Sequence, residues 1–181
     1  MKIISGKYKG RKILGYDIVG TRPTMDRVKE SVIAIIQNRI KDSVCLDLFA
    51  GTGSFGLELI SNGASHIVFV DNNKKVIETL SKNLENINIS ESYDMFECDY
   101  KMALKKIKNM NFKFDIIFLD PPYELHIIED SIDSIRELKL LNDNGIIICE
   151  YETEEIKQSG FKVLKNKVYG SKKIMILEKL K

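Results

Sequence analysis

The chain has few residues that bind transition metals or form disulfides. Its 181 residues include two histidines and three cysteines, an odd number with no Cys-x-x-Cys pair. No zinc-type cluster therefore has plausible spacing, and we predict no metal cofactor. Cys45, Cys98 and Cys149 lie within or at the end of apolar runs, a pattern typical of small buried thiols in a reducing compartment.

Long apolar runs are also absent. The longest has the length of a strand and is too short to cross a bilayer, and the first residues, "MKIISGKYKGRK", lack the apolar core of a signal peptide. There are no repeats, low-complexity tracts or obvious linkers. With 44% hydrophobic and 30% charged residues, the composition predicts a single globular unit, which we expect in the cytoplasm with no membrane partner.

Acidic residues are scarce at the two ends of the chain. Residues 1–30 carry eight Lys or Arg and three acids, and residues 157–181 carry eight and one, so their net charges are +5 and +7. Residues 31–156 carry twelve and twenty-two, a net charge of −10. Basic ends around an acidic body favour a polyanionic partner such as nucleic acid, although lysines that only solubilise exposed strands would give the same pattern.

Strand-like and helix-like patterns alternate along most of the chain. The first 20 residues contain short β-like runs and predict a small β extension, and a helix follows with Thr24 as candidate N-cap. Apolar runs at 43–49, 66–71, 93–99, 114–120 and 145–151 alternate with helical patterns, which predicts a parallel sheet with helices on both faces. Two runs around Tyr169-Gly170-Ser171 predict a closing hairpin.

A glycine-rich segment follows the first of these strands. Gly51-x-Gly53-x-x-Gly56 provides the sharp turn and close backbone approach that a ligand needs, although a tight strand–helix turn without a ligand also uses glycine. Asp71 ends the second strand, 20 residues after Gly51, where an acid commonly binds the ribose hydroxyls of adenosine. This pattern fits both NAD and S-adenosylmethionine.

Two further acids favour S-adenosylmethionine. Asp47 precedes the glycine loop, where a carboxylate would repel a pyrophosphate but attract the ammonium of a methionine moiety. Asp99 ends the third strand, where it can accept a hydrogen bond from the adenine amino group; a helix N-cap is the competing role, and both can hold at once.

Two of only three prolines stand together after the fourth strand, in Asp120-Pro121-Pro122-Tyr123. A Pro-Pro pair keeps the backbone extended and offers carbonyl acceptors without N–H groups. Asp120 and the Pro121 carbonyl can accept the hydrogens of an exocyclic amino group, and Tyr123 can stack on the base. Because a sheet ordered 3-2-1-4-5 makes the first and fourth strands neighbours, this loop and the glycine loop should face each other across one crevice. The predicted chemistry is methyl transfer to an aromatic amine, promoted by preorganised acceptors.

The motifs resemble those of class I S-adenosylmethionine-dependent N-methyltransferases, which have a Rossmann-like fold. The start of the chain, "IISGKYKGRKI" followed by "TRPTMDRVKESVI", is similar to that of the RsmD family, although many members have a second threonine where this chain has Met25. The resemblance runs almost end to end. It implies methylation of the exocyclic N2 of guanine 966 of 16S rRNA, in an assembled or nearly assembled small subunit with the base flipped into the pocket.

The resemblance also assigns residues. It implies a mostly parallel seven-stranded sheet, with an RNA-contacting extension at 1–22, a methyltransferase domain at 23–181, and a monomer. The implied cofactor residues are Asp47, Phe49, Gly51, Gly53, Asp71, Asn72, Asp99 and Tyr100. The implied catalytic residues are Asp120, Pro121, Pro122 and Tyr123. The candidates for RNA contacts are Lys7, Lys9, Arg11, Lys12, Arg22, Arg27 and Tyr123, and a solvated helix start is the competing role of Arg22 and Arg27.

Three other functions stay open at this point. A DNA adenine N6-methyltransferase shares the Asp-Pro-Pro-Tyr motif but usually carries a large target-recognition insertion. A non-catalytic RNA-binding assembly factor would not need the motif intact. An NAD-dependent oxidoreductase would explain the glycines but neither Asp47 nor residues 120–123.

Overall fold

The computed structural model describes residues 1–15, 22–122, 127–153, 155–157 and 160–180, with the backbone alone at 22–25. Its helices are α1 (Arg22–Ile40), α2 (Ser54–Ser61), α3 (Lys74–Ile87), α4 (Tyr100–Asn109) and α5 (Ile127–Glu137). Its strands are β1 (Val44–Asp47), β2 (His66–Asp71), β3 (Ser92–Glu97), β4 (Phe114–Leu119), β5 (Leu141–Tyr151), β6 (Phe161–Tyr169) and β7 (Lys172–Lys179).

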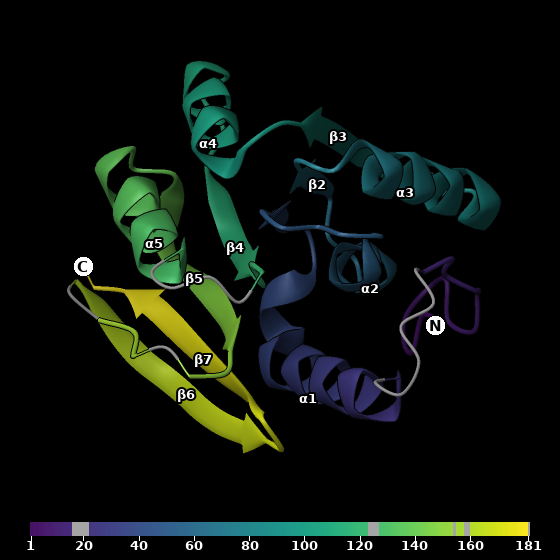
Figure 1. Ribbon diagram of the computed structural model, residues 1–181, viewed down its shortest axis with the longest axis horizontal. Helices are drawn as coiled ribbons and strands as arrows, with labels where there is room; N and C mark the ends of the chain where they lie inside the picture. The colour runs from purple at the N-terminus through teal and green to yellow at the C-terminus, as the bar shows by residue number, and fades with distance from the viewer. Residues whose placement is uncertain (16–21, 123–126, 154, 158–159, 181) are drawn as a thin grey trace.

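The strands form one seven-stranded sheet in the order β3-β2-β1-β4-β5-β7-β6 (Figure 1). Strands β1 to β5 are parallel, and β7 pairs antiparallel with both β5 and β6. The predicted order 3-2-1-4-5 and the predicted C-terminal hairpin are therefore confirmed. The order reverses between β1 and β4, which places the ends of these two strands side by side.

Helices cover both faces of the sheet because neighbouring strand residues point to opposite sides. Cys45 of β1 packs in the core with α1, α2 and α3, whereas the next residue, Leu46, packs in the core with α4 and α5. Both residues are fully buried, as expected for a parallel sheet between two helical layers. Cys45 and Cys149 are buried, Cys98 is partly exposed, and none of the three forms a disulfide within the described part of the chain.

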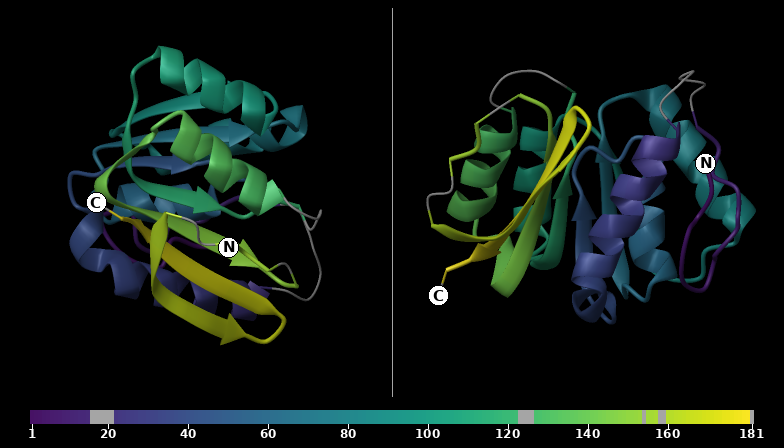
Figure 2. Two further views of the ribbon diagram at one scale, coloured as in Figure 1. Left: turned by 90° about the vertical axis from the view of Figure 1, so that its left-hand side faces the viewer. Right: turned by 90° about the horizontal axis from the view of Figure 1, so that it is seen from below.

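The N-terminal segment, residues 1–15, is less regular than the predicted β runs. Its strand-like pairing is a single isolated bridge between Lys2 and Lys12. The segment instead runs along α2 and α3 (Figure 2), where the N–H of Lys7 donates to the carbonyl of Ser61 at 2.7 Å. Ile3, Tyr8 and Ile13 are buried in the core. This segment is anchored by tertiary contacts more than by strand pairing.

Other boundaries also differ from the prediction: β1 and β3 end two residues earlier than predicted, at Asp47 and Glu97, so Asp99 follows β3 instead of ending it, and the starts of α1 and β5 differ as well. Helix α1 begins at Arg22, so Thr24 lies inside its first turn instead of capping it. Pro23 is tolerated there because the first N–H groups of a helix have no partner within it. Strand β5 begins at Leu141, four residues earlier than predicted, because Leu141 already pairs with Phe114 before an irregularity in the ladder. No helix in the described part of the chain is long and apolar enough to span a membrane.

Candidate active site

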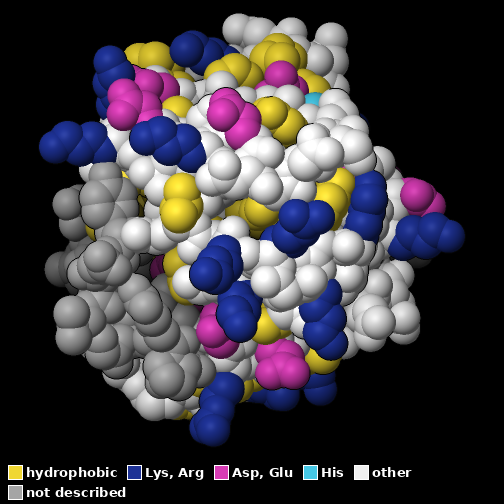
Figure 3. Space-filling model, turned by 90° about the vertical axis from the view of Figure 1, so that its right-hand side faces the viewer, with side chains coloured by type: hydrophobic (Ala, Val, Ile, Leu, Met, Phe, Trp, Pro, Cys, Tyr) yellow, Lys and Arg dark blue, Asp and Glu magenta, His cyan; other side chains and the backbone are white. Residues whose placement is uncertain are grey.

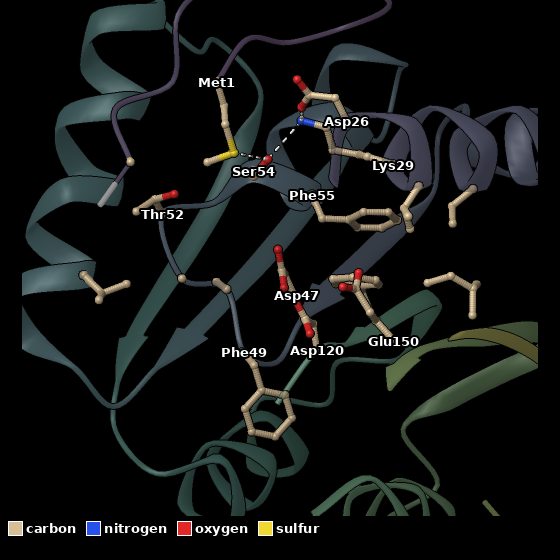
Figure 4. A pocket seen from close by; sticks show the side chains of 18 residues that line it. Met1, Asp26, Lys29, Asp47, Phe49, Thr52, Ser54, Phe55, Asp120 and Glu150 are labelled. Atoms are coloured by element: carbon tan, nitrogen blue, oxygen red, sulfur yellow. Dashed lines mark hydrogen bonds and ion pairs between the residues drawn. The ribbon is translucent and has the colours of Figure 1, made fainter. Parts of the chain in front are cut away.

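A cavity of about 270 Å³ opens at the carboxyl ends of β1 and β4 (Figure 4). Its wall is formed by the N-terminal segment, helices α1, α2 and α3, the glycine loop, and strands β4, β5 and β7. The charged residues that line it are Asp26, Lys29, Asp47, Asp120 and Glu150. Phe49 and Gly51 line it as well. The structure thus brings the glycine loop and Asp120 together, although 73 residues separate Asp47 from Asp120.

The three glycines of the loop differ in what surrounds them. Gly53 has φ of 84°, and an added Cβ would lie 2.3 Å from Leu80. Gly56 begins the packing of α2 on the sheet, where a Cβ would lie 2.3 Å from Phe69. Gly51 has φ of 54° and nothing within 4 Å of an added Cβ. Gly53 and Gly56 therefore serve packing, whereas Gly51 leaves open space beside the cavity.

Asp71 and Asp99 both hold backbone in place. The carboxylate of Asp71 accepts hydrogen bonds from the N–H groups of Gly51 and Asn73, both at 2.9 Å, and so fixes the glycine loop against the end of β2. Asp99 caps α4 by accepting from the N–H of Lys101 at 2.8 Å, which is the N-cap role predicted as one of two. Asn72, between Asp71 and Asn73, is exposed.

An aromatic pair lies beside these acids. The rings of Phe49 and Tyr100 are 5.4 Å apart between centroids and tilted by 49°. Phe49 lines the cavity, and Tyr100 begins α4 directly after Asp99. Flat side chains at the ends of β1 and β3 are suited to contact an aromatic heterocycle.

Asp47 is almost completely buried, with 1% of its surface exposed. Its Oδ2 accepts from the N–H of Gly56 at 3.0 Å, whereas its Oδ1 has no hydrogen-bond partner in the described part of the chain. Burial raises the pKa of Asp47 to about 7, and the charge of Asp71 adds to this effect, while the Gly56 hydrogen bond opposes it. An orphaned buried acceptor of this kind is suited to a cationic or hydrogen-bond-donating ligand.

Asp120 follows the last residue of β4 and points into the same cavity (Figure 4). Burial, and next the negative charge of Glu150, raises the pKa of Asp120 well above its usual range. Its carboxylate accepts no hydrogen bond from the described residues. Pro121 is buried and Pro122 exposed, while Tyr123 lies outside the described residues. The predicted stacking role of Tyr123 therefore stays a prediction.

Glu150 is a cavity residue that the sequence reasoning missed. It lies near the carboxyl end of β5, and its side chain is only 11% exposed and forms an ion pair with Lys172 of β7. Figure 4 shows the carboxylates of Asp47, Asp120 and Glu150 converging on one region. They do not form a metal site, because no cluster of three or more His, Cys, Asp or Glu among the described residues could hold an ion. The rule that ligands bind at the carboxyl ends of parallel strands could have identified Glu150.

Lys29 and Glu58 form a second unpredicted feature at the other end of the cavity. The Nζ of Lys29 lies 3.2 Å from Oε1 of Glu58 and donates to Oγ of Ser54 at 2.9 Å. The Glu58 side chain has no exposed surface, and its Oε1 also accepts from the N–H of Ile4 at 2.8 Å. One buried carboxylate therefore ties α1, α2 and the N-terminal segment together.

The predicted RNA-contacting residues lie on the surface where the structure describes their side chains. Those described as exposed are Lys7, Lys9, Arg11, Lys12 and Arg27. Figure 3 shows Lys and Arg side chains spread over the face that carries the N-terminal segment, with Asp and Glu among them. Lys7 is partly committed to the fold, since its Nζ pairs with Glu91 at 2.7 Å. The side chain of Arg22 lies outside the described residues.

Comparison with known proteins shows which family the chain belongs to. The model of a family described as "Conserved hypothetical protein 95" matches residues 1–178. The chain belongs to this family, the RsmD family. It is 35% identical over 173 residues to "Ribosomal RNA small subunit methyltransferase D" of Haemophilus influenzae, covering 94% of this chain and 89% of that protein. It is 36% identical over 154 residues to "Putative rRNA methyltransferase YlbH" of Bacillus subtilis, covering 85% and 84%.

A solved structure with the same fold is "Putative methyltransferase yhhF from Escherichia coli", with a TM-score of 0.87 and 28% identity. The match covers 99% of this chain and 97% of that one. The fold of this RsmD-family chain is therefore that of the class I methyltransferases, with an antiparallel C-terminal hairpin. The predicted fold class and family are confirmed.

Proposed function

We propose that this chain transfers a methyl group from S-adenosylmethionine to the exocyclic N2 of a guanine in 16S rRNA, guanine 966 by its family resemblance. The observation that carries the proposal is the single cavity in which Asp47, the glycine loop and Asp120 meet. The relatives' names, which specify rRNA and the small subunit, support the class of substrate. The proposed partner is the small subunit or its assembly intermediate, met in the cytoplasm by a monomer.

The cavity residues fit the cofactor. The orphaned Oδ1 of Asp47 would accept from the methionine ammonium, and the open side of Gly51 allows close backbone approach. Asp71 and Asn72 would bind the ribose hydroxyls. Asp99 would accept from the adenine amino group through the oxygen capacity that its N-cap bond leaves unused. We propose that the remaining assigned cofactor residues, Gly53, Phe49 and Tyr100, shape the loop and contact the adenine ring.

The proposed catalytic task of the chain is to activate a weak nucleophile. When bound, S-adenosylmethionine would supply an electrophilic methyl group: the N–C bond would form as the C–S electron pair stays on sulfur, and the proton lost by the amine would pass to solvent. The lone pair of a guanine amino group is delocalised into its ring. Asp120 and the Pro121 carbonyl would accept the amine hydrogens and stabilise the positive charge that develops on nitrogen. Pro122 would keep the loop stiff, and Tyr123 would stack on the flipped base.

The exposed cations of the N-terminal segment would contact the RNA backbone. We propose this role for Lys7, Lys9, Arg11, Lys12, Arg22 and Arg27. The proposal also divides the chain into an RNA-contacting extension at 1–22 and a methyltransferase domain at 23–181. The segment packs on α2 and α3 and also lines the cavity through Gly15. Backbone contacts of this kind would position the subunit without reading its sequence.

The test is a methylation assay with labelled S-adenosylmethionine and three substrates: small subunits that lack the modification, naked 16S RNA, and DNA. The methylated nucleotide is then mapped. We expect label on N2 of one guanine in small subunits. Label on DNA alone would instead indicate a DNA adenine methyltransferase.

The matched variant is Asp120→Ala. It is expected to bind S-adenosylmethionine as the wild type does, because Asp120 is assigned to the amine, and to lose roughly a hundredfold or more in turnover. Wild-type turnover in this variant would contradict the catalytic assignment. RNA binding without methylation by the wild type would favour a non-catalytic assembly factor.

A further inference from the structure

Glu150 has no role in the proposed methyl transfer, yet it faces the reacting region. It reaches the cavity from β5, the neighbour of β4, beside Asp120. Its carboxylate and that of Asp120 point toward the same part of the cavity (Figure 4). Two adjacent acids in a largely buried site repel each other, so an unused acid at this place has a cost for folding.

The carboxylate of Glu150 is held in place but retains a free acceptor. Lys172 binds its Oε1, and the two side chains are 15% and 11% exposed. Its Oε2 accepts no hydrogen bond from the part of the chain that the structure describes. A charge-assisted contact on one oxygen orients the other, which leaves a preorganised acceptor directed at the cavity.

The Watson–Crick edge of guanine matches this arrangement. It carries the N1–H donor directly beside the N2 amino group, whereas adenine has a lone pair at N1. We propose that Glu150 is the residue that selects guanine, by accepting the N1–H while Asp120 and the Pro121 carbonyl accept from N2. This inference rests on the proposed function and adds a specificity-determining residue to it. In a base with a lone pair on N1, this lone pair would face a lone pair of the Glu150 carboxylate, and the two would repel each other.

The experiment compares two target bases that share the reacting amine. Small subunits are assembled with ligated 16S RNA that carries either guanine or 2-aminopurine at the target position. 2-Aminopurine keeps the 2-amino group but lacks both the hydrogen on N1 and the O6 oxygen, so the change in ratio caused by Glu150→Gln, and not the wild-type ratio alone, reports on N1. Single-turnover methylation rates are measured at saturating S-adenosylmethionine for wild type, Glu150→Gln and Glu152→Gln.

We expect the wild type to methylate guanine about tenfold to a hundredfold faster than 2-aminopurine, the range for a hydrogen bond to a charged group. In Glu150→Gln the side-chain amide can donate to a bare N1, so this ratio should fall by about tenfold. Because both ratios are taken within one enzyme, any general change in rate cancels.

Glu152→Gln is the control. It removes the same charge two residues along the chain, near Asp120 but outside the cavity lining, so its ratio should equal that of the wild type. Equal wild-type rates on both bases, or an unchanged ratio in Glu150→Gln, would overturn the role of Glu150 while leaving guanine methylation intact. Absence of wild-type methylation of the guanine substrate would instead refute the proposed function, and this inference with it.

Discussion

Replacing Asp47 with asparagine should change how the stability of the protein depends on pH. Asp47 is 1% exposed, and only one of its two carboxylate oxygens has a described hydrogen-bond partner. Its pKa in the folded state is about 7, above the value of about 3.9 for an unfolded aspartate. The folded protein therefore retains a proton that the unfolded chain releases.

The sign and size of the effect follow from this difference. The stabilisation by the retained proton is fully present below about pH 4 and is lost as the pH rises to about 7. The measurement starts at pH 5, so only the interval of about two units between pH 5 and the folded pKa of about 7 contributes. The wild type should therefore lose about 3 kcal/mol of unfolding free energy through this group between pH 5 and pH 8.5. The asparagine side chain of the Asp47→Asn variant cannot titrate. The stability of the variant relative to wild type should therefore rise by that amount between the two pH values.

Urea unfolding followed by circular dichroism, without cofactor, at about pH 5 and pH 8.5 measures the two free energies. Asp42→Asn is the control for removing an acid at the surface, since Asp42 is exposed. A difference between Asp47→Asn and wild type that stays constant to about 0.5 kcal/mol would refute the reasoning. The same variant should bind S-adenosylmethionine more weakly, because a neutral amide does not attract its ammonium group.

Other substitutions separate the roles of the remaining residues. Asp120→Asn should lower turnover roughly a hundredfold. Because the pKa of Asp120 is raised, wild-type turnover should rise with pH through neutrality, and the variant should lose this dependence. Initial rates from about pH 6 to 9 measure both effects. Lys29→Met should lower the free energy of unfolding by about 3–5 kcal/mol in urea titrations, since it leaves a carboxyl buried without its cation, and adding Glu58→Leu should recover most of the loss. Both Gly51→Ala and Gly53→Ala should lower the melting temperature because both residues have positive φ, and Gly53→Ala should lower it more because its Cβ would also lie 2.3 Å from a leucine. Gly51→Ala should in addition weaken cofactor binding measured by calorimetry.

The parallel core could be predicted because its signals are local. Near-continuous apolar strands such as β2 and β4 indicate burial on both faces, and the alternation with helices fixes their direction. The order of β1 and β4 then follows from the doubly wound topology, and with it the shared cavity. The irregular N-terminal segment could not be predicted, since its conformation depends on contacts with Ser61 and other residues distant in sequence.

The acids in and around the cavity divide in the same way, into those that a sequence motif identifies and those that it does not. Asp47, Asp71 and Asp120 stand at strand ends within recognisable motifs, so sequence spacing was enough to place them. Glu150 stands in "CEY", without a motif, so only its place near the carboxyl end of a parallel strand could have indicated it. The buried position of Glu58 is set by the cation of Lys29, which belongs to a different helix. Pairing between distant polar residues leaves no periodic signal in one sequence.

The carboxylate shared by α1, α2 and the N-terminal segment also limits how this chain can evolve. The acid at position 58 is buried beside the cation at position 29, and the same acid binds the backbone N–H of residue 4, so loss of the cation leaves a buried acid without its charged partner. Drift at either position alone should be selected against. We therefore expect that relatives without a charge at position 29 also lack the acid at position 58. In those relatives the backbone N–H of residue 4 should bind a different acceptor.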